Sequence, residues 1–164
     1  ADDLLGAHPD YQLLQSIPGV GPVFALTILA EAGDLRRFAH HRQFLKFCGL
    51  DLAKSQSGTT RGRERLSKRG NARLRCAFWF AGRVAVRLRE SSIRDKYERY
   101  VAAAPGSADQ RRKAYTAIAA KMARIAHAVV KTGRPYRSYF EHDLPGGSIP
   151  LNRAVEASAL ATTS

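Results

Sequence analysis

The sequence predicts an all-α protein, in which a hairpin of two helices is followed by a small helical bundle, with a long basic loop between helices. Apolar residues recur at spacings of three and four over 72–89 and 108–132, as in helices that bury one face. No segment has the sustained apolar–polar alternation that is typical of a half-buried strand. With 164 residues, the chain is long enough to form one core without a metal or disulfide.

The ends of the helices carry recognisable signals. We expect helices over about 8–16, 22–32, 40–48, 72–89, 92–103 and 108–132. The N-cap candidates are Asn71, Ser92 and Ser107, and the C-terminal glycines are Gly33, Gly49 and Gly133. In the two long helices, the residues expected to face the core are Leu74, Phe78, Ala81, Ala85 and Leu88, and then Tyr115, Ile118, Met122, Ile125 and Val129. We also expect both cysteines, Cys48 and Cys76, to be small core residues.

These elements suggest one helical domain over 1–140. It comprises the helix pair at about 8–32, the basic loop at about 50–69 and the bundle at about 71–133. Residues 141–164 are rich in glycine, proline and small side chains and lack an apolar face, so we expect a flexible tail.

The turn between the first two helices reads Ile17-Pro18-Gly19-Val20-Gly21-Pro22. Its glycines permit a close approach, and Pro22 suits the first turn of the outgoing helix, whose free N–H groups attract anions. These residues resemble the helix-hairpin-helix motif, which implies contact with a nucleic-acid backbone without reading of the bases. The candidate contacts are Gly19, Val20 and Gly21, with Val20 packed inward. A tight turn between helices with no ligand is the alternative.

Charge also favours a polyanionic partner. Lys and Arg number 27 against 14 acids, for a formal net charge of +13. The charge is concentrated in residues 61–75, where Glu64 is the single acid. The candidate phosphate contacts there are Arg61, Arg63, Arg65, Lys68, Arg69, Arg73 and Arg75. For Arg73 and Arg75, an exposed helix face without a ligand is an equally good interpretation.

One loop residue has the chemistry of a nucleophile. Ser57 precedes Gly58 in a polar loop flanked by arginines, which can clamp phosphate oxygens and neutralise charge at phosphorus. By itself, a serine in a polar loop is most often a turn residue. Acids are scattered, so no metal site is expected in this chain, and His40, His41 and His127 are interpreted as capping, surface or core residues.

Four motifs in order resemble the C-terminal transposase domain of the insertion-sequence one-ten family, relatives of the pilin-gene invertases. They are the hairpin 17–22, the segment from Arg37-Phe38-Ala39 to Phe47-Cys48-Gly49-Leu50, the triplet Gln56-Ser57-Gly58, and the run Leu66-Ser67-Lys68-Arg69-Gly70-Asn71 leading to Leu74-Arg75. The resemblance extends from about Gln12 to Tyr136. Glu64 and the glycine spacing around Gly62 depart from the pattern, so only Ser57 is carried over as a catalytic residue.

The resemblance implies a DNA recombinase in which Ser57 forms a covalent phosphoserine with DNA. In this family the serine works with an N-terminal RuvC-like domain that binds magnesium through four acids, and a bridge RNA can select the DNA. We expect that domain to be absent from this chain, and the chain alone to need no cofactor and to be inactive. The expected full-length protein is a homo-oligomer in the bacterial cytoplasm, with no membrane association.

Two other functions remain open at this stage. The chain could be a non-catalytic helix-hairpin-helix module that only holds backbone phosphates. It could also be a DNA glycosylase, since such enzymes use the same hairpin. That interpretation is weaker because residues 23–32 contain no lysine, and Asp34 and Asp51 are the only nearby aspartates after the hairpin.

Overall fold

The fold was analysed in a computed structural model, which describes residues 8–53, 56–57, 60–61, 65–66, 69–88 and 92–137. The helices in that part of the chain are α2 (Pro9–Gln15), α3 (Pro22–Ala32), the 3₁₀ turn η1 (Leu35–Arg37), α4 (His41–Cys48), α5 (Ala72–Arg87), α6 (Ser92–Ala102) and α7 (Ala108–Thr132). The prediction of an all-α fold is therefore confirmed. Residues 1–7 and the expected tail at 141–164 lie outside the described residues.

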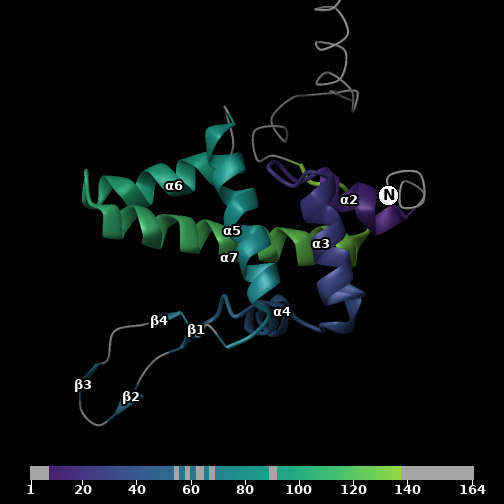
Figure 1. The fold of residues 1–164 in the computed structure, drawn as a ribbon, viewed down its shortest axis with the longest axis horizontal. Coiled ribbons are helices and arrows are strands. Elements are labelled where there is room, and N and C mark those ends of the chain that lie inside the picture. The colour runs from purple at the N-terminus through teal and green to yellow at the C-terminus, as the bar shows by residue number, and fades with distance from the viewer. Residues whose placement is uncertain are drawn as a thin grey trace, which may run out of the picture.

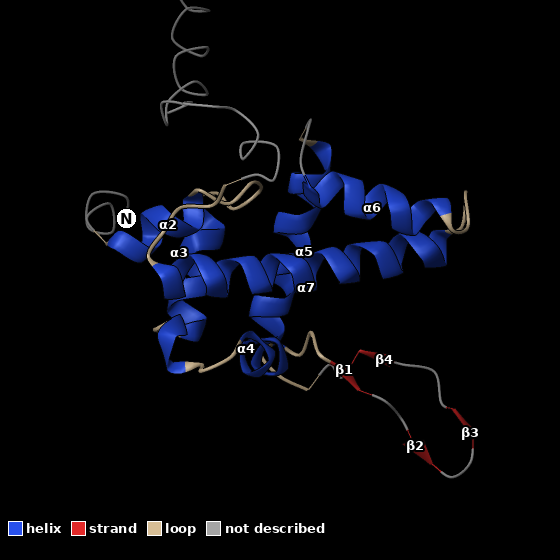
Figure 2. Cartoon of the chain, turned by 180° about the vertical axis from the view of Figure 1, so that it is seen from behind, coloured by secondary structure: helices blue, strands red, loops and turns tan. Residues whose placement is uncertain are grey.

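The segment expected to be a plain loop contains four strands of two residues each. They are β1 (Leu52–Ala53), β2 (Gln56–Ser57), β3 (Thr60–Arg61) and β4 (Arg65–Leu66). β1 pairs antiparallel with β4, and β2 pairs antiparallel with β3. We call residues 52–66 the basic arm, because Figures 1 and 2 show these strands leading away from the helices, with β2 and β3 farthest out.

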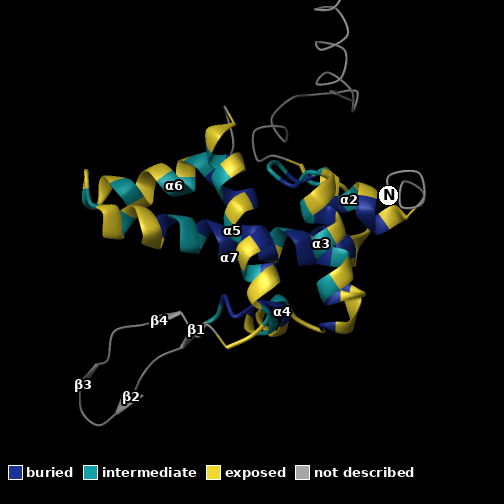
Figure 3. Cartoon of the chain, viewed as in Figure 1, coloured by how far each residue is buried: buried dark blue, intermediate teal, exposed yellow. Residues whose placement is uncertain are grey.

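Helix α7 is the centre of the fold. It runs across the molecule, with α5 crossing it, α6 alongside one half and α4 packed against it, whereas α3 packs against α5 (Figure 1). The predicted inner face is confirmed at Ile118, Met122 and Val129, which are buried. A Cβ on Gly82 of α5 would stand 2.8 Å from Cγ2 of Ile118, so this glycine allows α5 and α7 to approach closely. Figure 3 shows the buried residues concentrated where α5 crosses α7.

The predicted helix starts and stops are largely confirmed. The Asn71 side chain accepts the Leu74 N–H at 3.0 Å, and the Ser107 hydroxyl accepts the Gln110 N–H at 3.2 Å. Gly49 and Gly133 adopt the left-handed conformation after α4 and α7. His40 caps α4 in a capping box. At these positions, the residues next to the helix end were sufficient to predict where the helix begins or ends.

Two core predictions on α5 are wrong. Leu88 is 43% exposed because α5 ends at Arg87, and Leu88 already has extended backbone angles beyond the last turn. Cys76 is exposed, whereas Cys48 is buried. Cys76 lies two residues from both Leu74 and Phe78, which places it on the opposite face of the helix from that buried pair.

The aromatic core explains the position of His127. Phe44 of α4 meets Phe78 of α5 edge to face, with ring centroids 5.9 Å apart. His127 of α7 is buried beside Phe44, and its Nε2 lies 2.9 Å from the carbonyl oxygen of Phe38. The interpretation of His127 as a core residue is confirmed. In the described part of the chain, every helix is too short or too polar to cross a membrane.

Candidate nucleic-acid interface

The turn between α2 and α3 is built on two buried aliphatic side chains. Ile17 and Val20 are 1% and 4% exposed, and the Val20 N–H donates to the Ile17 carbonyl at 2.9 Å. The inward packing predicted for Val20 is thus confirmed. Gly21 is the extended N-cap of α3, and Pro22 occupies its first turn, so the chain enters α3 with its first N–H groups outside the helical ladder.

Gly19 has a packing reason for being glycine. Its φ of +86° is in the left-handed region, and an added Cβ would lie 2.3 Å from the Ala81 carbonyl oxygen and 2.8 Å from the Ala85 nitrogen. The turn therefore lies directly on the backbone of α5. An added Cβ on Gly21, in contrast, would meet nothing within 4 Å. Gly21 is consequently the glycine of this turn that is open to a ligand.

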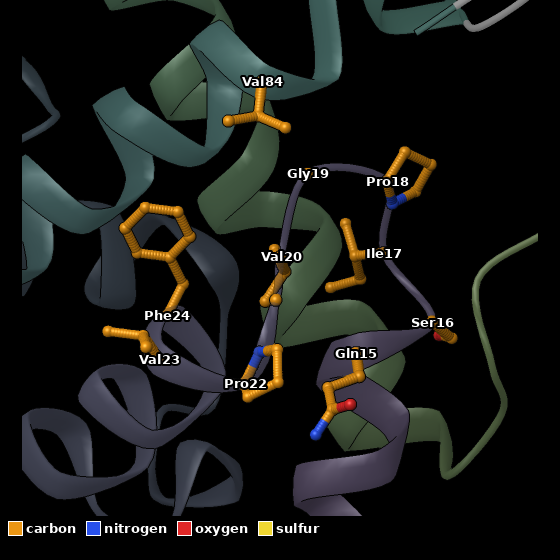
Figure 4. A pocket seen from close by; sticks show the side chains of 11 residues that line it. Gln15, Ser16, Ile17, Pro18, Gly19, Val20, Pro22, Val23, Phe24 and Val84 are labelled. Atoms are coloured by element: carbon orange, nitrogen blue, oxygen red, sulfur yellow. The ribbon is translucent and has the colours of Figure 1, made fainter. Parts of the chain in front are cut away.

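The surface around the turn is apolar. A shallow hollow of about 600 Å³ is lined by residues 15–24 and by Val84 of α5, and none of these lining side chains is charged. Figure 4 shows Val84 over the turn, with Val23 and Phe24 beside Val20 and Pro22. Val23 is 73% exposed. The turn can thus offer backbone donors and apolar contact, while the positive charge must come from other elements.

Ser57 lies on the outer ladder of the basic arm. The register pairs Ser57 with Thr60 and Gln56 with Arg61. On the inner ladder, Arg65 pairs with Ala53 and Leu66 with Leu52. This pairing brings three of the predicted site residues, Ser57, Arg61 and Arg65, onto one narrow arm. Gly58, Arg63 and Lys68 lie outside the described residues.

The returning end of the basic arm is anchored against the end of α4. Gly70 has a φ of +141°, and an added Cβ would lie 2.5 Å from the Phe47 carbonyl oxygen and 2.6 Å from the Gly49 nitrogen. The Asn71 N–H donates to that same Phe47 carbonyl at 2.8 Å. The Gly70-Asn71 pair therefore fixes the point at which the arm rejoins the helices, and Asn71 then caps α5.

An acid that the sequence analysis did not select holds this junction. Glu31 of α3 accepts from Asn71 Nδ2 at 2.7 Å and from Arg73 Nη1 at 2.9 Å. These two hydrogen bonds lower the pKa of the Glu31 carboxyl below its ordinary value, and the bond from Asn71 has the larger effect. The one available signal was that Glu31 is the sole acid within α3. Its partners lie about forty positions away in the sequence, which spacing alone does not reveal.

The predicted basic residues therefore differ in their surroundings. Arg69 is exposed at the base of the basic arm. Arg73 is bound to Glu31, although its side chain remains 81% exposed. Arg75 donates from Nη1 to the Cys48 carbonyl at 3.4 Å. Arg75 thus links α5 to the end of α4, whereas Arg73 links α5 to α3 through an exposed ion pair.

The two parts of the predicted site are not brought together within one chain. In Figure 1 the β2–β3 end of the basic arm lies below α7, whereas the α2–α3 turn lies above α7, against α5. Within the residues that the structure describes, no three His, Cys, Asp or Glu side chains are grouped so that they could hold a metal ion. These residues therefore do not fit a magnesium site.

Comparison with known proteins identifies the family. The family described as "Transposase IS116/IS110/IS902 family" matches residues 11–98, which include the turn, the basic arm, α5 and the start of α6. The transposase for insertion sequence element IS1111A of Coxiella burnetii is 40% identical over 81 residues, covering 49% of this chain and 22% of the relative.

Two further relatives have the same character. A probable family 20 transposase of Pseudomonas aeruginosa is 36% identical over 76 residues, covering 46% of this chain and 22% of its own. The insertion element IS110 uncharacterized 43.6 kDa protein of Streptomyces coelicolor is 28% identical over 148 residues, covering 88% of this chain and 33% of its own. The chain spans about a fifth to a third of the length of these relatives. On the strength of the match over 11–98, this chain belongs to the IS116/IS110/IS902 family of transposases.

Proposed function

We propose that this chain is the part of a DNA transposase that grips DNA and supplies Ser57 as the nucleophile for strand cleavage and exchange. The observation that supports this most directly is the family match over 11–98, which includes the basic arm that carries Ser57. The relatives are named as transposases, and a transposase must act on DNA. The net charge of +13 suits that partner.

The proposed step is a transesterification. The Ser57 Oγ attacks the phosphorus of a DNA phosphodiester, an Oγ–P bond forms and the bond from phosphorus to the leaving strand oxygen breaks. The hydroxyl proton passes to a base, and the leaving oxygen takes up a proton. Attack by a hydroxyl of another strand then reverses the chemistry and frees Ser57. One phosphodiester replaces another, so the exchange needs no external energy source.

The basic residues divide into two proposed roles. Arg61 and Arg65 lie on strands of the same arm as Ser57, and Arg63 and Lys68 are close to them in the sequence. We assign these four residues to clamp phosphate oxygens and to neutralise the charge that develops at phosphorus. Arg69 and the exposed guanidinium of Arg73 extend this path at the base of the arm. Arg75 acts by positioning, through its hydrogen bond to the end of α4.

The α2–α3 turn is proposed to hold a second stretch of DNA backbone. Gly21 is its open position, Val20 shapes the turn from inside, and Gly19 lets the turn lie on α5. Because this turn and the end of the basic arm are far apart in Figure 1, we propose that they contact different segments of the DNA. Neither contact reads base edges, so sequence selection comes from elsewhere.

The remaining parts of the machinery are assigned to other components. A magnesium ion, which supplies charge stabilisation and activation of the nucleophile when bound, would be held by a separate acidic RuvC-like domain. We further propose that the complete protein acts as a homo-oligomer and that a bridge RNA selects the DNA.

Capture of a covalent adduct tests the nucleophile. The chain is joined to the acidic domain of a relative and incubated with labelled cognate DNA and magnesium, and denaturing electrophoresis then detects protein-bound label. The parent should form the adduct, and Ser57→Ala should lose it while retaining DNA affinity. Ser55→Ala, two positions away on the same arm, is the matched control and should keep the adduct. An adduct that survives in Ser57→Ala would exclude Ser57.

A non-catalytic nucleic-acid-binding module is the second candidate. It is favoured by the packed role of Gly19, Arg73 and Arg75, which contribute to the fold whether or not chemistry occurs. It predicts salt-sensitive binding with no adduct in the parent fusion, under conditions in which a relative forms one.

A further inference from the structure

A second group of cations lies on α6 and α7, away from the basic arm. Lys96 and Arg99 are three residues apart on α6, and Lys121 and Arg124 are three residues apart on α7. We call these four residues the α6–α7 basic face. Residues three apart share a helix face, and α6 and α7 pack side by side. In Figure 2, α7 runs across the front between α6 and α4, without another helix over it.

This face is shaped as well as charged. A shallow groove of about 430 Å³ is lined by Lys96, Arg99 and Tyr100 with Ala103 and Gln110. Gln110 reaches across from α7 and donates its Nε2 to the Tyr100 carbonyl at 2.7 Å, which holds the ends of the two helices together. Lys121 is held in place by Ser92. Its Nζ donates to the Ser92 carbonyl oxygen at 2.7 Å and to the Ser92 hydroxyl oxygen at 3.0 Å. The groove and its cations are thus fixed by the packing of the helices.

The acids nearby are committed to other cations. Glu98 pairs with Arg94 at 2.7 Å, and Asp109 pairs with both Arg112 and Lys113. Of the acids in the described residues, Asp95 is the one whose charge acts on the group, through Lys121. No described carboxylate forms an ion pair with Lys96, Arg99, Lys121 or Arg124.

The cations act on one another. Burial, and then the charges of Arg124 and Arg99, lower the pKa of Lys96 from its ordinary value. Burial, followed by the charges of Lys96 and Arg99, likewise lowers the pKa of Lys121, and Asp95 opposes this only in part. Such a group is electrostatically unfavourable in the free protein, and a polyanion placed over it would relieve the repulsion.

The positive region continues toward α4. Loss of hydration, and then the charges of His40 and Arg124, lower the pKa of His41, so the charge of Arg124 also acts on the first residue of α4. Lys131 lies seven residues after Arg124, about two helical turns along the same side of α7, and its Nζ donates to the Ala39 carbonyl. A row of cations along one exposed helix suits a linear polyanion better than a single small anion.

We propose that the α6–α7 basic face binds the phosphodiester backbone of a nucleic acid, at a site separate from the basic arm and from the α2–α3 turn. The shared chemistry is the phosphate row, which both duplex DNA and duplex RNA present. The family match over 11–98 ends within α6, so Lys121 and Arg124 lie beyond the matched segment. This inference does not depend on the chemistry of Ser57.

The test compares two double variants that remove the same charge. Lys96→Gln with Arg124→Gln removes unpaired cations from the α6–α7 basic face. Arg112→Gln with Lys113→Gln is the matched control, because it removes two cations of α7 that both form ion pairs with Asp109. Fluorescence anisotropy measures the affinity of the chain for a labelled DNA duplex and for an RNA duplex of the same random sequence, over a series of salt concentrations.

The face variant should bind at least one duplex more weakly, on the order of tenfold at low salt, and its log–log salt slope should fall by about two. The control variant should show smaller changes in affinity and in salt slope than the face variant. Because like charges are removed, the face variant should also unfold at a temperature no lower than the control. Weaker binding of DNA alone, of RNA alone or of both identifies the source of the backbone. Parent-like affinity and slope on both duplexes would overturn the proposal, while Ser57→Ala should bind as the parent does.

Discussion

At the scale of single residues, Gly19 makes the sharpest prediction. Gly19→Ala must accommodate both a φ of +86° and a Cβ at 2.3 Å from the Ala81 carbonyl oxygen. Gly133→Ala is the control, since its φ is +64° and its ψ is 21°, with nothing within 4 Å of the added Cβ. We expect Gly133→Ala to cost about 1 kcal/mol of unfolding free energy and Gly19→Ala about 3 kcal/mol or more. Chemical denaturation measures both, and equal losses would mean that the contact with α5 can relax.

The two cysteines should differ in reactivity. Burial raises the pKa of the Cys48 thiol to about 12, so it is neither accessible nor ionised at neutral pH. Cys76 is exposed on α5. In the native protein an alkylating reagent should modify one thiol per chain, as measured by mass spectrometry, and Cys76→Ser should abolish the reaction. Modification of Cys48 at a comparable rate in the Cys76→Ser variant would show that α4 opens readily.

Residue-level inference from sequence succeeded where the cause is local. Val20 is the one aliphatic residue between the two glycines of the turn, and its burial is predicted correctly. The role of Gly19 could not be predicted in full, because the atoms that exclude a Cβ belong to Ala81 and Ala85, over sixty positions away. Cys76 was misplaced because apolar composition was given more weight than its angular position on the helix.

At the scale of elements, the cap of α5 should be worth more than the cap of α7. Ser107→Ala removes one acceptor, for the Gln110 N–H, and should cost about 1 kcal/mol. Asn71→Ala removes the acceptor for the Leu74 N–H and also the donor to Glu31, and should cost about 2 kcal/mol. Asn71→Asp, which keeps the cap acceptor but faces the Glu31 carboxylate, should recover less than half of the loss. Full recovery, measured by denaturant unfolding, would show that the link to Glu31 contributes nothing.

The strands of the basic arm could not be predicted from the sequence, unlike the ends of the helices. Caps and C-terminal glycines are encoded by residues within one turn of the helix end, which is why α3 and α7 are predicted with their observed bounds. The ladders of the arm consist of two residues per strand, with polar residues at most positions, so no alternation of apolar and polar residues could reveal them. Their register depends on closure of the arm at Gly70 and Asn71, which is a tertiary contact with α4.

At the scale of the whole molecule, charge was predictable in amount but not in distribution. The net charge of +13 indicates a polyanionic partner, and the run at 61–75 locates one basic region. The α6–α7 basic face could not be found in this way, because its four cations come as two spaced pairs on helices separated in sequence by the turn at 103–107. Only the packing of α6 along α7 brings these four cations together. The neighbouring acids Glu98 and Asp109 form their ion pairs with other cations, which the sequence does not show.

One ion pair should give the whole fold a defined acid sensitivity. Asp10 of α2 is 6% exposed and accepts hydrogen bonds from Nη1 and Nη2 of Arg36, each at 2.7 Å. This pair ties α2 to η1. The hydrogen bonds from Arg36 lower the pKa of the Asp10 carboxyl below 3.8, against the weaker opposing effect of burial. A lowered folded-state pKa gives stability that is fully present above the unfolded-state pKa and is lost as the pH falls through the folded-state pKa. The parent should therefore gain stability from Asp10 at neutral pH and lose it progressively below about pH 4.

Asp10→Asn tests this linkage because the amide does not titrate in that range. At pH 7 the variant should unfold with a free energy about 1–2 kcal/mol below that of the parent, since Arg36 is 44% exposed and water partly compensates its charge. The difference should narrow as the pH falls through 4 toward the folded-state pKa, as measured by urea denaturation across that range. Glu98→Gln, which breaks the exposed pair with Arg94, is the control and should change the free energy of unfolding by less than about 0.5 kcal/mol throughout that pH range. A constant difference between Asp10→Asn and the parent from pH 7 to pH 3 would show that Asp10 stabilises α2 through packing and not through its charge.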